Sequence, residues 1–265
     1  MTAITRAQKA YFAAVGSFAL WVGIWGYFVP AEVARALPWQ VPPLHARFLG
    51  AVYFSAAVLL FGGLTARLYA EVRAMVPVIA VWTGMLLVVS LFHLGEFDFH
   101  HKPVWFWFFA YVLYPVLGFW WIWRHRGQDE RLPGSPLPAW VAASFKALCA
   151  VLVLLALAML LAPQLVATLW PWKITPLLVQ IYSAPFLAYG LASGMLARQK
   201  TWPEVRLVVG GLLVFVTGVL VASVLHRGVF APGRLATWVW FGSFLGAVVL
   251  LGGMVLRLRR RGVTP

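Results

Sequence analysis

Eight separate apolar runs of about 20 residues constrain this chain more than any other feature. The hydrocarbon core of a bilayer is about 30 Å thick, and roughly 20 apolar residues cross it as a helix. No run alternates polar and apolar residues as the strands of a membrane barrel do. We therefore predict an all-α integral membrane protein with eight transmembrane helices at 11–29, 44–66, 74–94, 103–123, 140–162, 177–197, 207–225 and 236–256.

The second half of the chain repeats the first at an offset of 133 residues. Tryptophan is the strictest test in so apolar a chain, because 15 tryptophans in 265 residues would coincide less than once by chance at a given offset. Three pairs coincide, namely Trp39 with Trp172, Trp105 with Trp238 and Trp107 with Trp240. A second series matches Ser90, His93, Gly95 and Phe97 with Ser223, His226, Gly228 and Phe230.

This repeat predicts the organisation of the chain. We expect a first four-helix unit at 1–127, a linker rich in proline and glycine at 128–138, and a second four-helix unit at 139–265. Because each unit has an even number of helices, both units enter the membrane from the same side. The two repeats are then parallel and related by a pseudo-two-fold axis along the membrane normal.

The basic residues predict the orientation. With both termini and the linker on one side, that side carries 14 of the 21 Lys and Arg residues and the other side carries 6. Positive residues mark the cytoplasmic side, so we expect a multi-pass protein of a bacterial-type inner (plasma) membrane with both termini in the cytoplasm. The net charge of +14 is then a topology signal and does not indicate a nucleic-acid partner. The expected partners are the lipid bilayer and, as an open alternative, other membrane subunits.

Small-residue spacing distinguishes the two units. The second unit has Gly190-x-x-x-Gly194 and Gly242-x-x-x-Gly246, which allow helices to approach closely in lipid. From these spacings we expect a tightly packed second unit and a bulkier, more aromatic first unit.

His93 and His226 end the third and seventh spans, each two residues before a glycine. One interpretation is a helix C-terminus, in which the glycine adopts a left-handed conformation and the histidine suits the negative end of the helix dipole. The other is that the pseudo-axis brings the two imidazoles together around a haem-type macrocycle.

The first unit adds Glu96, Asp98, His100 and His101 after the third span, where the second unit has Val229, Ala231, Gly233 and Arg234. His93, Glu96, Asp98, His100 and His101 are nitrogen and oxygen donors of the kind that bind zinc or another divalent metal. The alternative is a solvated outer loop whose carboxylates are neutralised by Arg47 or Lys102. A ligand near this outer face would meet His45, Arg47, Trp39, Trp105 and Trp107.

The predicted spans contain no Asp or Glu, although ion-coupled transporters usually place ionisable groups at mid-membrane. A neutral path remains open along eight polar residues within the spans, namely Thr83, Ser90, Tyr111, Tyr114, Gln180, Tyr182, Tyr189 and Thr217.

The sequence thus favours a non-catalytic membrane protein that binds or translocates a small or apolar ligand near its outer face. Two alternatives stay open. One is an accessory subunit of a larger membrane complex, and the other is a metal- or lipid-dependent enzyme that uses the cluster at 96–101.

Overall fold

The computed structural model describes residues 2–32, 41–128 and 131–261. In this part of the chain, eight helices are long and apolar enough to cross a membrane, which confirms the predicted spans and fits a multi-pass membrane protein. They are α1 (Arg6–Phe28), α3 (Pro43–Thr65), α5 (Met75–Phe92), α6 (Lys102–Arg124), α7 (Ala139–Leu161), α9 (Pro176–Leu196), α10 (Trp202–Leu225) and α11 (Leu235–Arg261). The short helices α4 (Tyr69–Val72) and α8 (Pro163–Leu169) lie between some of them.

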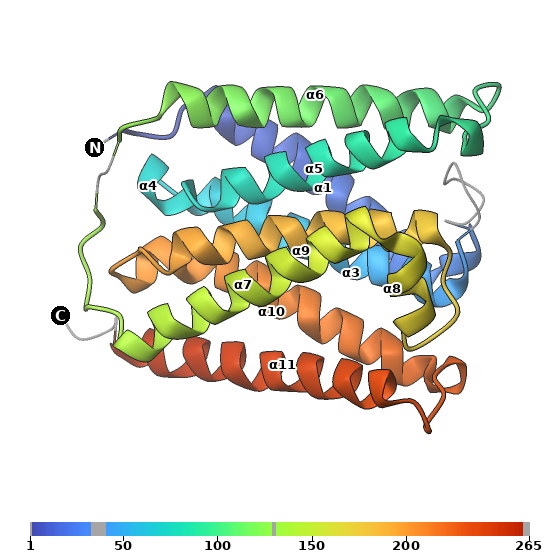
Figure 1. Ribbon diagram of the computed structural model, residues 1–265. Coiled ribbons are helices and arrows are strands. Elements are labelled where there is room, and N and C mark those ends of the chain that lie inside the picture. Colours follow the sequence, from blue (N-terminus) through green and yellow to red (C-terminus); the bar gives the residue numbers. More distant parts are fainter. Residues whose placement is uncertain (1, 33–40, 129–130, 262–265) are drawn as a thin grey trace.

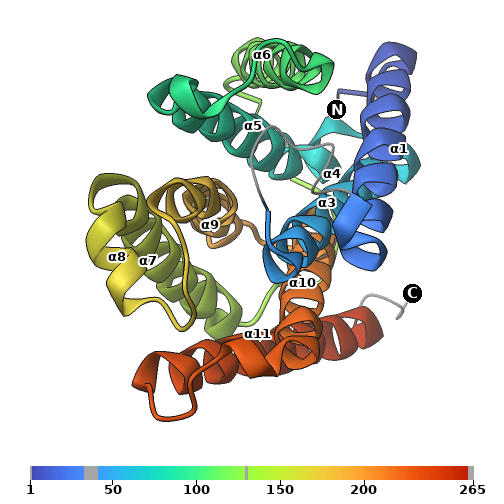
Figure 2. The ribbon, with the colours of Figure 1, turned by 90° about the vertical axis from the view of Figure 1, so that its right-hand side faces the viewer.

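Four helices form the centre of the bundle and four lie at its periphery. Between the halves, α3 packs against α10 and α5 packs against α9. The outer helices pack onto this centre, α1 on α3, α6 on α5, α7 on α9 and α11 on α10. Burial follows the same order, since 78% of the apolar stretch of α9 is buried but only 17% of that of α7. Figure 2 shows this arrangement from one end of the bundle.

α1 begins and α11 ends at the same end of the bundle (Figure 1), which we call the terminal end. The opposite end carries the connections from α5 to α6 and from α10 to α11. Each of these connections starts with a 3₁₀ turn, η1 (Leu94–Glu96) and η2 (Arg227–Val229).

The two halves differ where the third and seventh spans begin. α10 is continuous from Trp202, whereas α4 and α5 are separated by a turn at Arg73 and Ala74. Pro77 explains the break, because its nitrogen has no proton to donate to the carbonyl of Arg73 and its ring clashes with that carbonyl. The residue at the offset of 133 is Gly210, which leaves the helix intact.

Carboxylates cap the helices at the terminal end and pair across the halves. Glu71 accepts hydrogen bonds from the backbone N–H groups of Arg67 (2.8 Å) and Leu68 (3.1 Å). The Arg206 guanidinium donates to Glu71 at 2.7 Å. Glu204 caps α10 in the same way, and Arg73 lies 3.7 Å from it. Each carboxylate therefore meets the arginine of the other half.

A tryptophan–serine hydrogen bond recurs at the opposite end. Trp107 donates its indole N–H to the Ser90 hydroxyl at 2.9 Å, and Trp240 donates to Ser223 at the same distance. Ser90 and Ser223 each donate in turn to a backbone carbonyl of their own helix. These bonds tie α6 to α5 and α11 to α10.

The expected left-handed glycine caps after His93 and His226 were wrong. Positive φ angles among the described glycines occur at Gly127 and Gly134, not at Gly95 or Gly228. The chain instead tightens into the two 3₁₀ turns, in which Glu96 N–H donates to the His93 carbonyl at 2.9 Å. This tighter turn satisfies the terminal carbonyl without a change of backbone hand.

The predicted glycine contacts of the second half are confirmed in one helix only. A Cβ on Gly190 would lie 2.9 Å from Val153 Cγ2 and one on Gly194 would lie 3.0 Å from Cys149 Sγ, so α9 approaches α7 closely. A Cβ on Gly242 or Gly246 would meet no heavy atom of the described residues within 4 Å, because both glycines are exposed on α11.

Candidate functional site

A cavity of about 650 Å³ lies inside the first half of the chain. Its walls come from α1, α3, α5 and α6. Small and aliphatic side chains of the central helices form its buried surface, including Ala46, Leu49, Ala56, Leu60 and Ile79. The cavity is thus an internal space of the first four-helix unit, and it is almost entirely apolar.

The cavity opens between α1 and α6. On this side its rim consists of exposed aromatic side chains, Trp21 and Trp25 from α1 and Phe106 from α6. Glu32 and Lys102 also line it, both at the opposite end of the bundle. Among the described lining residues, charged groups therefore lie only at this end of the opening, which we call the mouth of the cavity.

Glycines explain why α1 closes on α3 and leaves α6 apart. A Cβ on Gly50 of α3 would lie 2.7 Å from the backbone nitrogen of Tyr27, and one on Gly26 would lie 3.1 Å from the Ala46 carbonyl oxygen. α1 and α6 meet through ring contacts such as Tyr11 with Trp121, whose centroids are 4.9 Å apart. Helices joined by large rings stay further apart than helices joined at glycines, and the cavity lies in the space between them.

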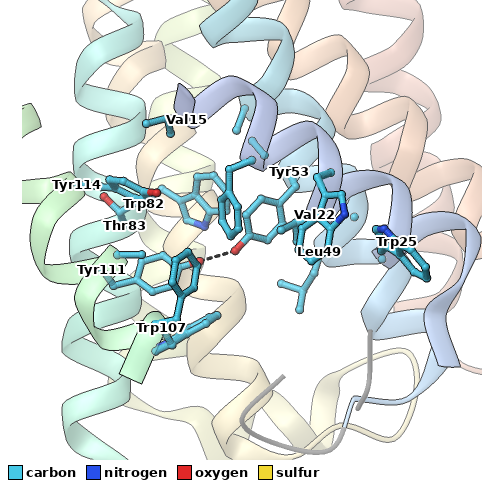
Figure 3. Close-up of a pocket in the computed structure, with 18 of the residues that line it drawn as sticks. Val15, Val22, Trp25, Leu49, Tyr53, Trp82, Thr83, Trp107, Tyr111 and Tyr114 are labelled. Atoms are coloured by element: carbon cyan, nitrogen blue, oxygen red, sulfur yellow. Dashed lines mark hydrogen bonds between the residues drawn. The ribbon is translucent and has the colours of Figure 1, made fainter. Parts of the chain in front are cut away.

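Hydroxyl groups gather at the deep part of the cavity (Figure 3). The phenol groups of Tyr53 on α3 and Tyr111 on α6 are hydrogen-bonded to each other across it. Thr83 on α5 and Tyr114 on α6 line the same space. Tyr111 is nine residues into α6, or roughly 13 Å along the helix axis, so these groups lie near the middle of the span.

Large aromatic rings occupy the equivalent region of the second half. At the offset of 133, the wall residues Leu49 and Ala56 correspond to Tyr182 and Tyr189, which are 0% and 3% exposed. Tyr53 and Tyr111 correspond to Phe186 and Phe244, and both rings contact Phe215 at centroid distances of 6.3 Å. The expectation of a bulkier first half was wrong at these positions, because the largest side chains fill the second half.

His45 lies outside the cavity, in a buried contact between the halves. It is 2% exposed, and Trp172 donates its indole N–H to His45 Nε2 at 3.2 Å. An indole nitrogen can only donate, so Nε2 has no proton and the imidazole is neutral with its proton on Nδ1. Nδ1 then donates to the Tyr182 hydroxyl. The predicted ligand residue joins α3 to α9 and to the loop that precedes α9.

The two histidines considered for a macrocycle are engaged separately. His93 Nε2 lies 2.5 Å from Gln180 Oε1 of α9, and the Arg47 guanidinium lies 2.5 Å from His226 Nε2. Because Arg47 can only donate, His226 Nε2 accepts and the ring is neutral. Burial lowers the pKa of His226, and the positive charge of Arg47 lowers it further. No contact joins the two imidazoles within the described residues.

The structure does not bring the predicted metal ligands together. Asp98 accepts a hydrogen bond from the backbone N–H of His100 at 2.9 Å, and Glu96, Asp98, His100 and His101 are all exposed. Within residues 2–32, 41–128 and 131–261, no three His, Cys, Asp or Glu side chains are placed to hold a metal ion.

The three tryptophans predicted at the outer face do not lie together in one site. Trp107 lines the cavity and is 8% exposed. Trp105 is 62% exposed and donates to the Phe99 carbonyl at 2.9 Å. Trp39 lies outside the described residues.

Of the eight residues predicted to line a neutral path, Thr83, Tyr111 and Tyr114 line the cavity. The other five, Ser90, Gln180, Tyr182, Tyr189 and Thr217, do not. The prediction missed Tyr53 and Trp82. Both residues sit within apolar runs, and the only sequence signal for Tyr53 is that its counterpart in the repeat, Phe186, has no hydroxyl.

Comparisons with known proteins add no identity: no protein-family model, no curated protein and no solved structure matches this chain.

Proposed function

We propose that the protein is a non-catalytic inner-membrane protein that binds or translocates an uncharged, apolar small molecule through the cavity of its first half. The observation that carries this proposal is the cavity of about 650 Å³ between α1, α3, α5 and α6. Ligand sites in proteins are typically about 300–1,000 Å³ and mostly apolar, with a few placed polar groups.

The wall chemistry supports an uncharged ligand. The deep part of the cavity offers aliphatic surfaces, aromatic rings and neutral hydroxyls, while Glu32 and Lys102 lie at the mouth. A charged group in the membrane interior is costly unless an opposite charge pairs with it. The chemistry of the walls therefore favours a molecule that already dissolves in lipid.

The opening between α1 and α6 supports entry from the bilayer. Trp21 is 56% exposed and Phe106 is 50% exposed, and both are at the rim. In a membrane these rings would contact lipid, so a lipophilic molecule would pass between the two helices without crossing water.

The topology that we propose places the mouth at the outer leaflet. The basic residues assign the terminal end to the cytoplasm, by the positive-inside rule. The opposite end, with Glu32 and Lys102, then faces outward, which agrees with the expected ligand site near the outer face.

We further propose that the bundle is a parallel duplication about a pseudo-two-fold axis along the membrane normal. The matched contacts support this arrangement. Glu71 with Arg206 and Glu204 with Arg73 exchange partners between the halves. His93 with Gln180 and His226 with Arg47 do the same, because residues 47 and 180 are also 133 positions apart.

A cavity-filling variant tests the function. Ala56 is buried in the cavity wall, whereas Val58 on the same helix is 38% exposed on the surface of the bundle. We expect the wild-type protein, purified in mild detergent, to carry a stoichiometric lipophilic molecule detectable by native mass spectrometry. Ala56→Phe should lose it and the matched control Val58→Phe should keep it. A wild-type protein with no such molecule, or an Ala56→Phe protein that retains it, contradicts the proposal.

A further inference from the structure

The hydroxyl pair in the cavity leaves one proton without an acceptor. Tyr53 and Tyr111 have two phenol protons between them, and the hydrogen bond that joins them uses one. Whichever phenol accepts in that bond keeps its own proton, and no further hydrogen bond is formed by either hydroxyl within the described residues. The pair therefore offers one O–H donor to the cavity.

Two more donors line the same space. The phenol of Tyr114 and the indole N–H of Trp82 make no hydrogen bond to any residue in the described part of the chain, and both side chains line the cavity. An indole nitrogen donates and cannot accept. Thr83 differs, because its hydroxyl already donates to the Ile79 carbonyl at 2.7 Å.

The balance of donors and acceptors defines the complementary ligand. Three donors without acceptors surround the deep part of the cavity, and carboxylate side chains are absent from the described residues there. A hydrogen-bond donor in an apolar site is costly when it has no partner, so the ligand that binds best supplies acceptors. A carbonyl oxygen accepts and carries no net charge, which suits a site at mid-membrane.

The aromatic walls indicate a flat ligand. The ring of Trp82 meets Tyr53 edge-on at 5.2 Å, and the ring of Trp107 lies 4.2 Å from that of Tyr111. Rings from α3, α5 and α6 thus surround the hydroxyls, and planar ring systems pack against such walls by stacked or edge-on contacts.

We propose that the cavity binds a planar, uncharged, lipid-soluble ring compound with carbonyl oxygens, of the quinone type, and that the Tyr53–Tyr111 pair donates its one free O–H to one of these oxygens. This inference rests on the proposed apolar-ligand function and specifies its substrate class. The tyrosine pair acts as a shared donor, so either phenol alone can supply the hydrogen bond.

The test compares two probes of the same shape. Binding of 2-methyl-1,4-naphthoquinone and of 2-methylnaphthalene, which lacks the carbonyls, is measured by equilibrium dialysis on protein in lipid nanodiscs. The Ala56→Phe protein measures the partition into lipid, and cavity binding is the excess of wild type over this variant. We expect the wild type to bind the quinone about tenfold more tightly than the hydrocarbon.

The tyrosine variants separate a shared donor from a structural role. Tyr53→Phe and Tyr111→Phe should each bind the quinone within about twofold of wild type, because one O–H remains in each. The double variant should lose about tenfold for the quinone and nothing for the hydrocarbon. Retained hydrocarbon binding also shows that the double variant is folded.

The outcomes distinguish this inference from the proposed function. Equal cavity binding of both probes, or a double variant that binds the quinone like wild type, overturns the carbonyl inference and leaves the apolar site in place. Absence of cavity binding for both probes overturns the inference and the proposed function together.

Discussion

Substitution of Gly50 by alanine tests the close approach of α1 and α3 that shapes the cavity. The new Cβ would lie 2.7 Å from the backbone nitrogen of Tyr27 and 3.0 Å from the carbonyl carbon of Gly26. Ordinary contacts begin at 3.4 Å, so α1 must move away by about 0.7 Å. The obstacle is backbone, which cannot rotate aside as a side chain does.

The magnitude follows from two opposing effects. A gap of this size removes roughly a quarter to a half of the dispersion energy of the contacts between the two helices. Overpacking of this kind destabilises the folded state by about 3 kcal/mol, at the upper end of its usual range. Alanine also favours the helix over glycine by about 1 kcal/mol. We therefore expect Gly50→Ala to lower the free energy of unfolding by about 2 kcal/mol.

The assay is reversible unfolding in mixed micelles by titration with a denaturing detergent, with helical circular dichroism as the signal. Gly246→Ala is the matched control, because this glycine is also mid-helix and a Cβ there meets nothing within 4 Å. The control should be unchanged or more stable by up to about 1 kcal/mol. A Gly50→Ala protein as stable as the control would refute the backbone contact between α1 and α3.

Two further predictions concern orientation and pH. Reporter domains fused to each terminus should both report the cytoplasm, because the basic residues concentrate at that end, and an external C-terminus would refute the proposed parallel duplication. Burial and the charge of Arg47 lower the pKa of His226 in the folded protein. As the pH falls through about 6.5, this histidine therefore takes up a proton in the unfolded chain before it does so in the folded protein, which destabilises the fold. Thermal midpoints measured from pH 8 to pH 5 should therefore fall less in His226→Asn than in wild type, and equal slopes would show that this histidine is not linked to stability.

The spans could be predicted from the sequence because their signal is local. Each apolar run has to form its own backbone hydrogen bonds in lipid, so length and composition are sufficient to identify a helix. The helix boundaries depend on single residues. The break between α4 and α5 depends on Pro77, and the early start of α10 at Trp202 depends on a capping carboxylate, Glu204, that folds back onto the preceding backbone.

The cavity could be identified only from the tertiary structure, because it is a volume between helices that their side chains leave unfilled. Leu49 and Ala56 are unremarkable apolar residues in a span, and only their position opposite α6 makes them cavity walls. The sequence directed attention to the histidines, yet His45, His93 and His226 form contacts between the halves. Tyr53 and Tyr111 are 58 residues apart, and no local pattern indicates that they meet.

The sequence by itself determined that this chain is a helical membrane protein with eight spans, since the need to satisfy the backbone in lipid acts on each segment alone. The tertiary structure decided that the open space lies in the first half and that donors converge in it. Those properties depend on which side chains from distant segments fill a shared volume, and Tyr182 and Tyr189 fill in the second half what Leu49 and Ala56 leave empty in the first.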